Sequence, residues 1–157
     1  MNQKTNSIST QITTLKMDSK MIEHKISSNG YQEWFLNGFY HREDGPALIW
    51  EDGSKFWHQN GKCHREDGPA VIYPNGYQKW YLNGKLHRTD GPAVIYPDGE
   101  QQWWINGELH REDGPAIIYA DGKQQWFKNG VLHQQFDDIK LKNITIKELQ
   151  FNIKDGF

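Results

Sequence analysis

The sequence contains a single cysteine, Cys63, among its 157 residues. One thiol cannot form an intrachain disulfide or a cysteine-based zinc cluster, and such scarcity is typical of a reducing compartment. No apolar run approaches the ~18 residues that a membrane-spanning helix needs. Residues 1–20 lack both the apolar core of a secretory signal and the arginine-rich character of a transit peptide. These absences predict a soluble cytoplasmic protein with no membrane partner.

An excess of charge of one sign is also missing, because the formal net charge is only −2. A protein that binds nucleic acid in general, or an acidic membrane surface, usually needs a strong positive field. Only 36% of the residues are hydrophobic, yet 13% are aromatic and seven are tryptophan. The composition therefore excludes general nucleic-acid binding and predicts packing by large rings more than by aliphatic chains.

What the sequence does contain is a repeat with a period of 23 residues. Five histidines, five tryptophans and five Asn-Gly pairs keep this step without an insertion: His41, His64, His87, His110 and His133; Trp34, Trp57, Trp80, Trp103 and Trp126; and the pairs that begin at Asn37, Asn60, Asn83, Asn106 and Asn129. A second glycine series, from Gly30 to Gly122, has the same spacing. Internal repeats of this length indicate stacked units rather than one irregular domain.

The sequence pattern of each unit predicts β-hairpins. In residues 87–109, the apolar segment Ala93–Tyr96 predicts a strand, and a Pro-Asp-Gly turn follows it. Gln101–Ile105 predicts a second strand, and Asn106-Gly107 is a strong signal for a two-residue hairpin turn. Residues 108–111 predict a short return strand. No useful helical period occurs between Gly30 and Leu132.

The expected fold is therefore all-β: tandem antiparallel β-hairpins that form an elongated single-sheet or solenoid-like plate with capping terminal segments. We divide the chain into a polar N-terminal segment or degenerate cap (1–28), the repeats (29–133) and a C-terminal β cap or dimerisation segment (134–157). In the first segment Ile8, Ile12 and Leu15 have helix-like spacing, so a short amphipathic helix and disorder are alternative expectations there.

A Tyr-Pro-Asp-Gly turn, a central Trp, an Asn-Gly-Lys turn and a following His, cycling every 23 residues, resemble MORN repeats and their divergent bacterial and viral variants. The HREDGPA-type tandem motif is similar to repeats of phage and giant-virus proteins. It departs from the standard unit, where Gly-x-Gly follows the histidine. The resemblance covers about residues 29–133 and implies a β-hairpin scaffold for protein contacts or self-association, without catalysis.

The motif HREDGPA stands at residues 41–47, 64–70 and 110–116, and HRTDGPA stands at residues 87–93. Histidine, arginine and carboxylates invite a metal or acid–base interpretation, but one histidine per unit does not bring three ligands to one ion. A turn is the favoured interpretation, in which Asp caps backbone amides, Arg pairs with a carboxylate and Gly-Pro sets the bend. Contact with a ligand or partner is the remaining alternative. We expect no metal site and no cofactor.

The residue after each central tryptophan varies, and strand alternation places it on the opposite face from that tryptophan. These candidate binding residues are Phe35, His58, Tyr81, Trp104 and Phe127. The aromatic residues that end the first strands are expected to share their face: Trp50, Tyr73, Tyr96 and Tyr119. Lys55, Lys79, Gln102 and Gln125 are expected to flank them. Such a face suits recognition of a protein surface or a stacked base. The alternative is a second core layer, covered by the terminal segments or by a dimer mate, whereas the central tryptophans themselves are expected to be core.

Nothing in the sequence favours catalysis, and we expect no catalytic residue. Cys63 is followed by His64, but neighbours on a strand point to opposite faces and do not form a dyad. The first functional hypothesis is therefore a non-catalytic scaffold for protein–protein interaction, which as a viral or phage protein would bind and inhibit a host factor in the host cytoplasm, or pair with itself. The alternative is a sponge that binds a small nucleotide-like ligand between the aromatic residues and the arginine series Arg42, Arg65, Arg88 and Arg111.

Overall fold

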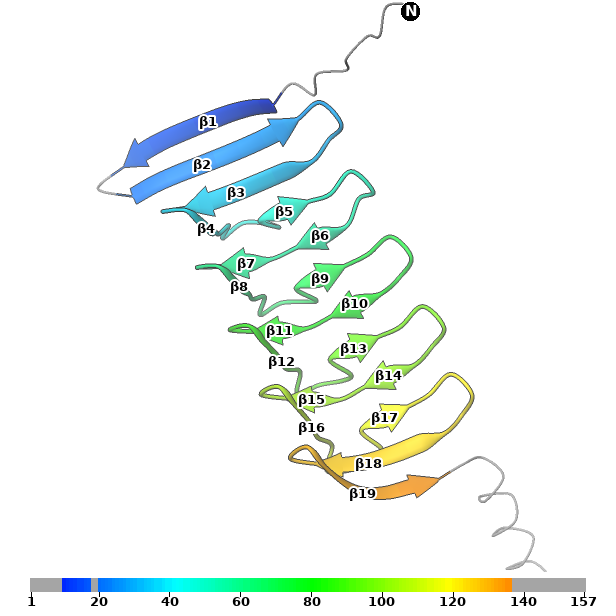
Figure 1. Cartoon of the computed structure of the whole chain (residues 1–157). Coiled ribbons are helices and arrows are strands. Elements are labelled where there is room, and N and C mark those ends of the chain that lie inside the picture. Colours follow the sequence, from blue (N-terminus) through cyan, green and yellow to red (C-terminus); the bar gives the residue numbers. More distant parts are fainter. Residues whose placement is uncertain (1–9, 18–19, 137–157) are drawn as a thin grey trace, which may run out of the picture.

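The computed structural model describes residues 10–17 and 20–136, and these form 19 β-strands that pair in antiparallel fashion. Thirteen strands make one large sheet in the order β1-β2-β3-β5-β6-β9-β10-β13-β14-β17-β18-β19, with β4 beside β3. Three two-stranded sheets, β7-β8, β11-β12 and β15-β16, lie along it. Figure 1 shows the result as one elongated stack of hairpins. The described residues contain no helix that could cross a bilayer. The expected all-β hairpin repeat is confirmed.

The chain enters the stack through a long hairpin. Strands β1 (Thr10–Met17) and β2 (Lys20–Ser27) pair along their whole length, and β2 then pairs with β3 (Gln32–Leu36). The expected amphipathic helix in this segment is wrong. Five of the eight residues of β1 are threonine, isoleucine or leucine, and β-branched residues such as threonine and isoleucine favour strands. Pairing with β2 supplies the backbone hydrogen bonds of this segment, whereas an isolated short helix is only marginally stable in water.

The repeating part begins at β3 and ends at β19. Its remaining strands are β4 (Phe39–Tyr40), β5 (Leu48–Ile49), β6 (Lys55–Phe56), β7 (His58–Gln59), β8 (Lys62–Cys63), β9 (Val71–Ile72), β10 (Gln78–Lys79), β11 (Tyr81–Leu82), β12 (Lys85–Leu86), β13 (Val94–Ile95), β14 (Gln101–Gln102), β15 (Trp104–Ile105), β16 (Glu108–Leu109), β17 (Ile117–Ile118), β18 (Gln124–Lys128) and β19 (Val131–Phe136). The cap or dimerisation element expected at residues 134–157 lies outside the described residues after Phe136.

Two kinds of turn close the hairpins, and both follow from local sequence. At the Asn-Gly pairs both residues have positive φ, for example 53° at Asn106 and 88° at Gly107, as the two-residue hairpin turn requires. The turn at the opposite end of the hairpins contains Gly99, which has a φ of 94°. The Gly99 amide donates to the Tyr96 carbonyl at 3.1 Å, and the Tyr96 amide donates to the Glu100 carbonyl at 2.9 Å. This is the three-residue hairpin with glycine in the left-handed position.

Adjacent units are joined by the backbone. The Trp80 amide donates to the Ala93 carbonyl at 2.8 Å, and the Arg88 amide donates to the Trp104 carbonyl at 3.1 Å. The Gly107 amide donates to the Leu86 carbonyl at 2.8 Å. The same bonds recur at the neighbouring junctions, so each unit is held by the units before and after it.

The fully buried side chains are small. Ala47, Ala70, Ala93 and Ala116 have no exposed surface. Val94, which follows Ala93 and begins β13, is 1% exposed. The central tryptophans are only half-buried, so the expectation of a tryptophan core needs correction. A single-layer sheet has no second layer to cover such large rings, and one ring face is covered instead by the loop that follows the tryptophan in the chain, as described below.

Candidate functional site

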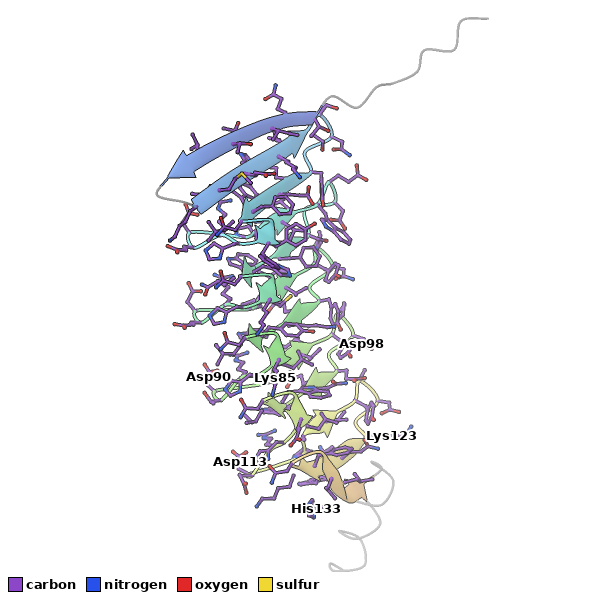
Figure 2. The ribbon with its side chains drawn as sticks, turned by 60° about the vertical axis from the view of Figure 1, so that its left-hand side comes forward. Lys85, Asp90, Asp98, Asp113, Lys123 and His133 are labelled. Atoms are coloured by element: carbon purple, nitrogen blue, oxygen red, sulfur yellow. The ribbon has the colours of Figure 1, made fainter. Side chains whose placement is uncertain are left out.

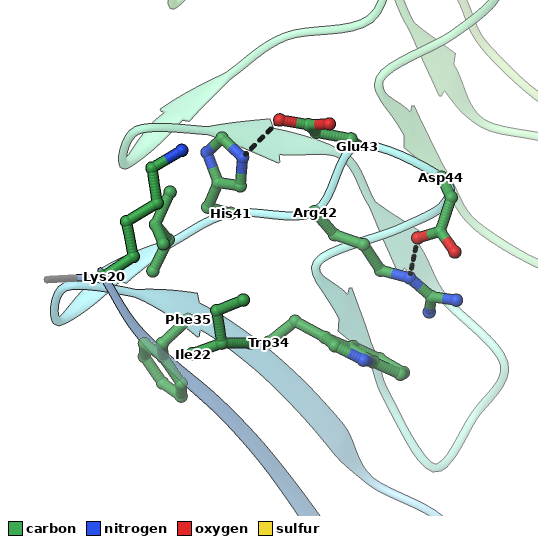
Figure 3. A pocket seen from close by; sticks show the side chains of 9 residues that line it. Lys20, Ile22, Trp34, Phe35, His41, Arg42, Glu43 and Asp44 are labelled. Carbon is green, nitrogen blue, oxygen red and sulfur yellow. Dashed lines mark hydrogen bonds and ion pairs between the residues drawn. The ribbon is translucent and has the colours of Figure 1, made fainter. Parts of the chain in front are cut away.

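Each HREDGPA-type loop folds back over the central tryptophan that precedes it in the chain. The guanidinium carbon of Arg42 lies 4.1 Å from the centre of the Trp34 ring, and Nε of Arg42 donates to Oδ1 of Asp44 at 2.8 Å (Figure 3). Arg65, Arg88 and Arg111 repeat both contacts in their units. A cation over an aromatic face and an arginine–carboxylate pair are both favourable. Arg therefore pairs with the Asp of its own loop and covers the tryptophan.

The histidine of each loop joins its unit to the next. Nδ1 of His41 accepts a hydrogen bond from the Asn60 amide at 3.1 Å, and His64, His87 and His110 accept in the same way from the next Asn-Gly turn. In a neutral ring that accepts at Nδ1, the proton resides on Nε2. Nε2 of His41 lies 3.6 Å from Oε1 of Glu43. The histidine thus stabilises the register between units.

The loop carboxylates face solvent. Asp44, Asp67, Asp90 and Asp113 have side chains at least 80% exposed, and the Arg hydrogen bond in each loop lowers the pKa of its Asp. Figure 2 shows Asp90 and Asp113 on one edge of the stack, and Asp98 and Lys123 on the other. Among the described residues, no three histidine, cysteine, aspartate or glutamate side chains gather as metal ligands do. These contacts favour the turn interpretation of the motif.

Open grooves separate successive loops. One groove of about 740 Å³ lies between residues 65–69 and 87–90, with Trp80 and Leu82 among its lining side chains. A second groove of about 700 Å³ lies one unit further along and is lined by Trp103 and Ile105 at the equivalent positions. We call this side of the sheet the loop face: it carries the central tryptophans and the four loops.

The candidate binding residues that follow the tryptophans lie on the other side of the sheet. Trp34 and Phe35 are neighbours within strand β3 and so point to opposite faces. His58, Tyr81, Trp104 and Phe127 hold the equivalent position, and all five side chains are half-buried. The Phe35 ring stacks on Tyr40 at 4.7 Å between ring centres, and Tyr40 lies 5.7 Å from His58. Rings of adjacent units therefore contact one another.

The aromatic residues that end the first strands belong to the same side. An unbroken series of ring contacts, 4.9 to 5.7 Å between centres, runs from Trp50 through Phe56, Tyr73 and Tyr77 to Tyr96. In the next unit the Tyr119 hydroxyl donates to Gln125 Oε1 at 3.0 Å. We call this side the aromatic face and define it by two rows of residues: Phe35, His58, Tyr81, Trp104 and Phe127; and Trp50, Tyr73, Tyr96 and Tyr119.

A third row lies between these two. Cross-strand pairing places Phe56 opposite Leu48 and Val71, Lys79 opposite Val71 and Val94, and Gln102 opposite Val94. Opposed residues share a face, so Lys79, Gln102 and Gln125 flank the aromatic rows as expected. Lys55 does not, because it pairs with Ile49 and Ile72 on the loop face. The residue that keeps the 23-residue step in this row is Phe56.

The aromatic face is not covered by any other described segment. The described strands make a single layer (Figure 1). The β1–β2 hairpin extends the sheet beside β3 instead of folding over it. Trp50 keeps 44% of its surface exposed. Within residues 10–17 and 20–136, the face is thus open to a partner.

The arginine series and the aromatic rows are not brought together. Each arginine lies over a central tryptophan on the loop face, while Tyr81 and its equivalents lie on the aromatic face. Each arginine also donates to the proline carbonyl of its own loop, at 3.2 Å for Arg88 and Pro92. A single small ligand does not reach both sets of groups.

One polar pair was missed by the sequence analysis. Sγ of Cys63 lies 3.2 Å from Nε2 of His58, across the two-residue turn at Asn60-Gly61. The hairpin rule contains this signal, because such a turn pairs the second residue before it with the second residue after it. Burial raises the pKa of the Cys63 thiol and lowers the pKa of His58. Both shifts favour the neutral pair over an activated thiolate.

No protein-family profile and no curated protein matched this chain when it was compared with them. The resemblance to MORN repeats therefore stays a prediction from the sequence, and the function is inferred from the geometry of the two faces.

Proposed function

We propose that the protein is a non-catalytic repeat scaffold that binds another protein through its aromatic face. The observation that carries the proposal is the continuous row of half-buried rings on an uncovered side of a single-layer sheet, with Trp50 44% exposed. Tyrosine, tryptophan and phenylalanine are enriched at protein interfaces, and a few such rings carry most of the binding energy.

The polar groups of the face agree with this role. The Trp104 indole donates to Gln102 Oε1 at 3.0 Å, and Gln102 donates to Glu100 at 2.7 Å. The Trp104 ring is thereby held in place before a partner arrives, which reduces the entropy lost on binding. We extend the proposal to the source and the partner: a viral or phage protein that occupies and inhibits a host protein in the host cytoplasm. A second copy of the chain is the competing partner.

The double variant Tyr81→Ala with Trp104→Ala tests the proposal. We expect it to lose the proteins that the wild type retains in a pull-down from host lysate, because two adjacent rings of the face are removed. The matched control is Gln78→Ala with Gln101→Ala, which changes the loop face of β10 and β14, the strands that directly precede β11 and β15 in the chain. Circular dichroism and thermal unfolding test whether each variant folds.

If the alanine variant unfolds, Tyr81→His with Trp104→His replaces it, because His58 occupies the equivalent position in this fold. Retention of the same partners by a folded variant of either kind contradicts the proposal. Size measurement in solution identifies self-association. A thermal-shift screen with nucleotides tests the sponge alternative, which no contact of the arginine series favours.

A further inference from the structure

Among the described residues, Lys79 is the one cation near the middle of the aromatic face. It lies in β10, between Val71 and Val94 of the two neighbouring strands, and its side chain is half-buried. Its position recurs in every unit, and the members of this row are Glu33, Phe56, Lys79, Gln102 and Gln125.

The other polar side chains of this row have hydrogen-bond partners. Glu33 Oε1 accepts from the Tyr31 and Tyr40 hydroxyls, each at 2.7 Å. Gln102 accepts from Trp104, and Gln125 accepts from Tyr119. In the part of the chain that the structure describes, the Lys79 side chain has neither a hydrogen bond nor an ion pair, and its ammonium lies 5.1 Å from the centre of the Tyr77 ring.

The surroundings of Lys79 are aromatic. Tyr77 lies between Tyr73 and Tyr96, with ring centres 5.7 and 4.9 Å away. Burial raises the pKa of the Tyr81 hydroxyl, and the Lys79 charge offsets part of this rise. The same charge also has a lowering effect on the pKa of Tyr96 and of Cys63. The ammonium therefore lies near tyrosines of its own unit and of the next one. A partly desolvated ammonium without an anion is unfavourable.

We propose that Lys79 receives a carboxylate side chain from an extended segment of the protein partner, whose neighbouring residues pack on Tyr77 and Tyr81. The inference depends on the proposed function, because it names the chemistry of the same surface. A carboxylate supplies the anion that the row itself lacks at this unit, in a charge-assisted hydrogen bond. One ammonium matches one carboxylate. Phosphate groups of a nucleotide bring more negative charge than one ammonium balances.

The test uses a random dodecapeptide library displayed on yeast, selected on the wild-type full chain at neutral pH. We expect the recovered peptides to share an aspartate or glutamate next to an aromatic or aliphatic residue. The variant is Lys79→Gln, which places at this unit the residue that the next two units already carry. The control is Lys85→Gln, which makes the same charge change at an exposed site in β12, paired with Leu82.

We expect Lys79→Gln to weaken binding of a selected synthetic peptide about tenfold, and Lys85→Gln to leave it unchanged. Replacing the acidic residue of the peptide by its amide should cost the same factor, and the two changes should not add, because they remove one contact. Binders without an acidic residue, or equal affinity for Lys79→Gln, overturn the inference.

The same peptides separate this inference from the proposed function. Loss of peptide binding in Tyr81→Ala with Trp104→Ala, but not in Lys79→Gln, keeps the aromatic interface and removes the carboxylate. Binding that survives both variants removes both. ATP that stabilises the wild type but not Lys79→Gln in a thermal-shift assay overturns the inference, because the site then serves a phosphate ligand.

Discussion

The guanidinium carbon of Arg88 lies 4.2 Å from the centre of the Trp80 ring and would lie 3.0 Å from a Cβ on Gly91. The arginine is therefore held between an aromatic ring and a glycine of its own loop. The other three loops have the same arrangement. The glycine of the motif is required by the close approach of a side chain, since no positive φ is involved there.

Gly91→Ala should destabilise the protein by about 1–3 kcal/mol, because the new methyl group meets the Arg88 guanidinium and forces it off Trp80. Urea unfolding followed by tryptophan fluorescence measures the loss. In an Arg88→Ala background the same substitution should cost much less. An equal cost in both backgrounds would mean that backbone strain, and not the arginine, requires the glycine.

Asn106→Ala should cost about 1–2 kcal/mol, because alanine is disfavoured at the positive φ of 53° found there. Asn106→Gly should cost much less, since glycine adopts this conformation readily. It also keeps the backbone N–H that donates to His87 Nδ1. Chemical denaturation of both variants gives the comparison. If glycine is as damaging as alanine, the contact between the Asn106 side chain and His87 matters more than the turn.

Replacing Asp44, Asp67, Asp90 and Asp113 by asparagine should lower the melting temperature at neutral pH but not in strong acid. Arg lowers the pKa of each carboxyl in the folded state. The ion pairs therefore stabilise the fold above the unfolded pKa of about 3.9, and this stabilisation is lost as the pH falls through the lower folded values. All four positions are changed together because one exposed pair contributes little. A melting-temperature difference that persists unchanged at about pH 2 would contradict the assignment.

Cys63 should react slowly with iodoacetamide. The midpoint of its pH–rate profile should lie above pH ~8.5, the pKa typical of a free thiol. Burial raises its pKa, and burial lowers the pKa of its neighbour His58, so proton transfer between them is disfavoured. His58→Phe, which introduces the residue type that Phe35 provides at the equivalent position, should leave the midpoint high. A wild-type midpoint below about 8.5 that rises in this variant would show that the histidine activates the thiol.

The repeat, the turns and the aromatic face could be predicted from the sequence because local rules set them. Asn106-Gly107 and the Pro-Asp-Gly turn before Glu100 determine where the chain reverses. Strand alternation then separates Phe35 from Trp34. The burial of the tryptophans could not be predicted in this way, since it depends on a loop folding back over the sheet. Residues 10–17 also show the limit of spacing arguments, because the strand there is stabilised by pairing with β2.

That the Lys79 side chain has no hydrogen bond or ion pair among the described residues could not be predicted either. The sequence shows that a lysine stands at this position of the row. It does not show which tyrosine or tryptophan side chains donate hydrogen bonds to Glu33, Gln102 and Gln125. Composition therefore predicts that an aromatic face exists, and geometry identifies Lys79 as the cation within it that has no anion among the described residues.

The junction between units has a consequence for how such a chain changes over time. Each junction uses the same backbone bonds and the same histidine contact with the next Asn-Gly turn. If a deletion removed the coding DNA of one or more whole repeats, two units that were not neighbours before would become neighbours. They would form the same contacts at their new junction. Unequal recombination can thus add, delete or reorder the side chains of the aromatic face without building a new interface between units.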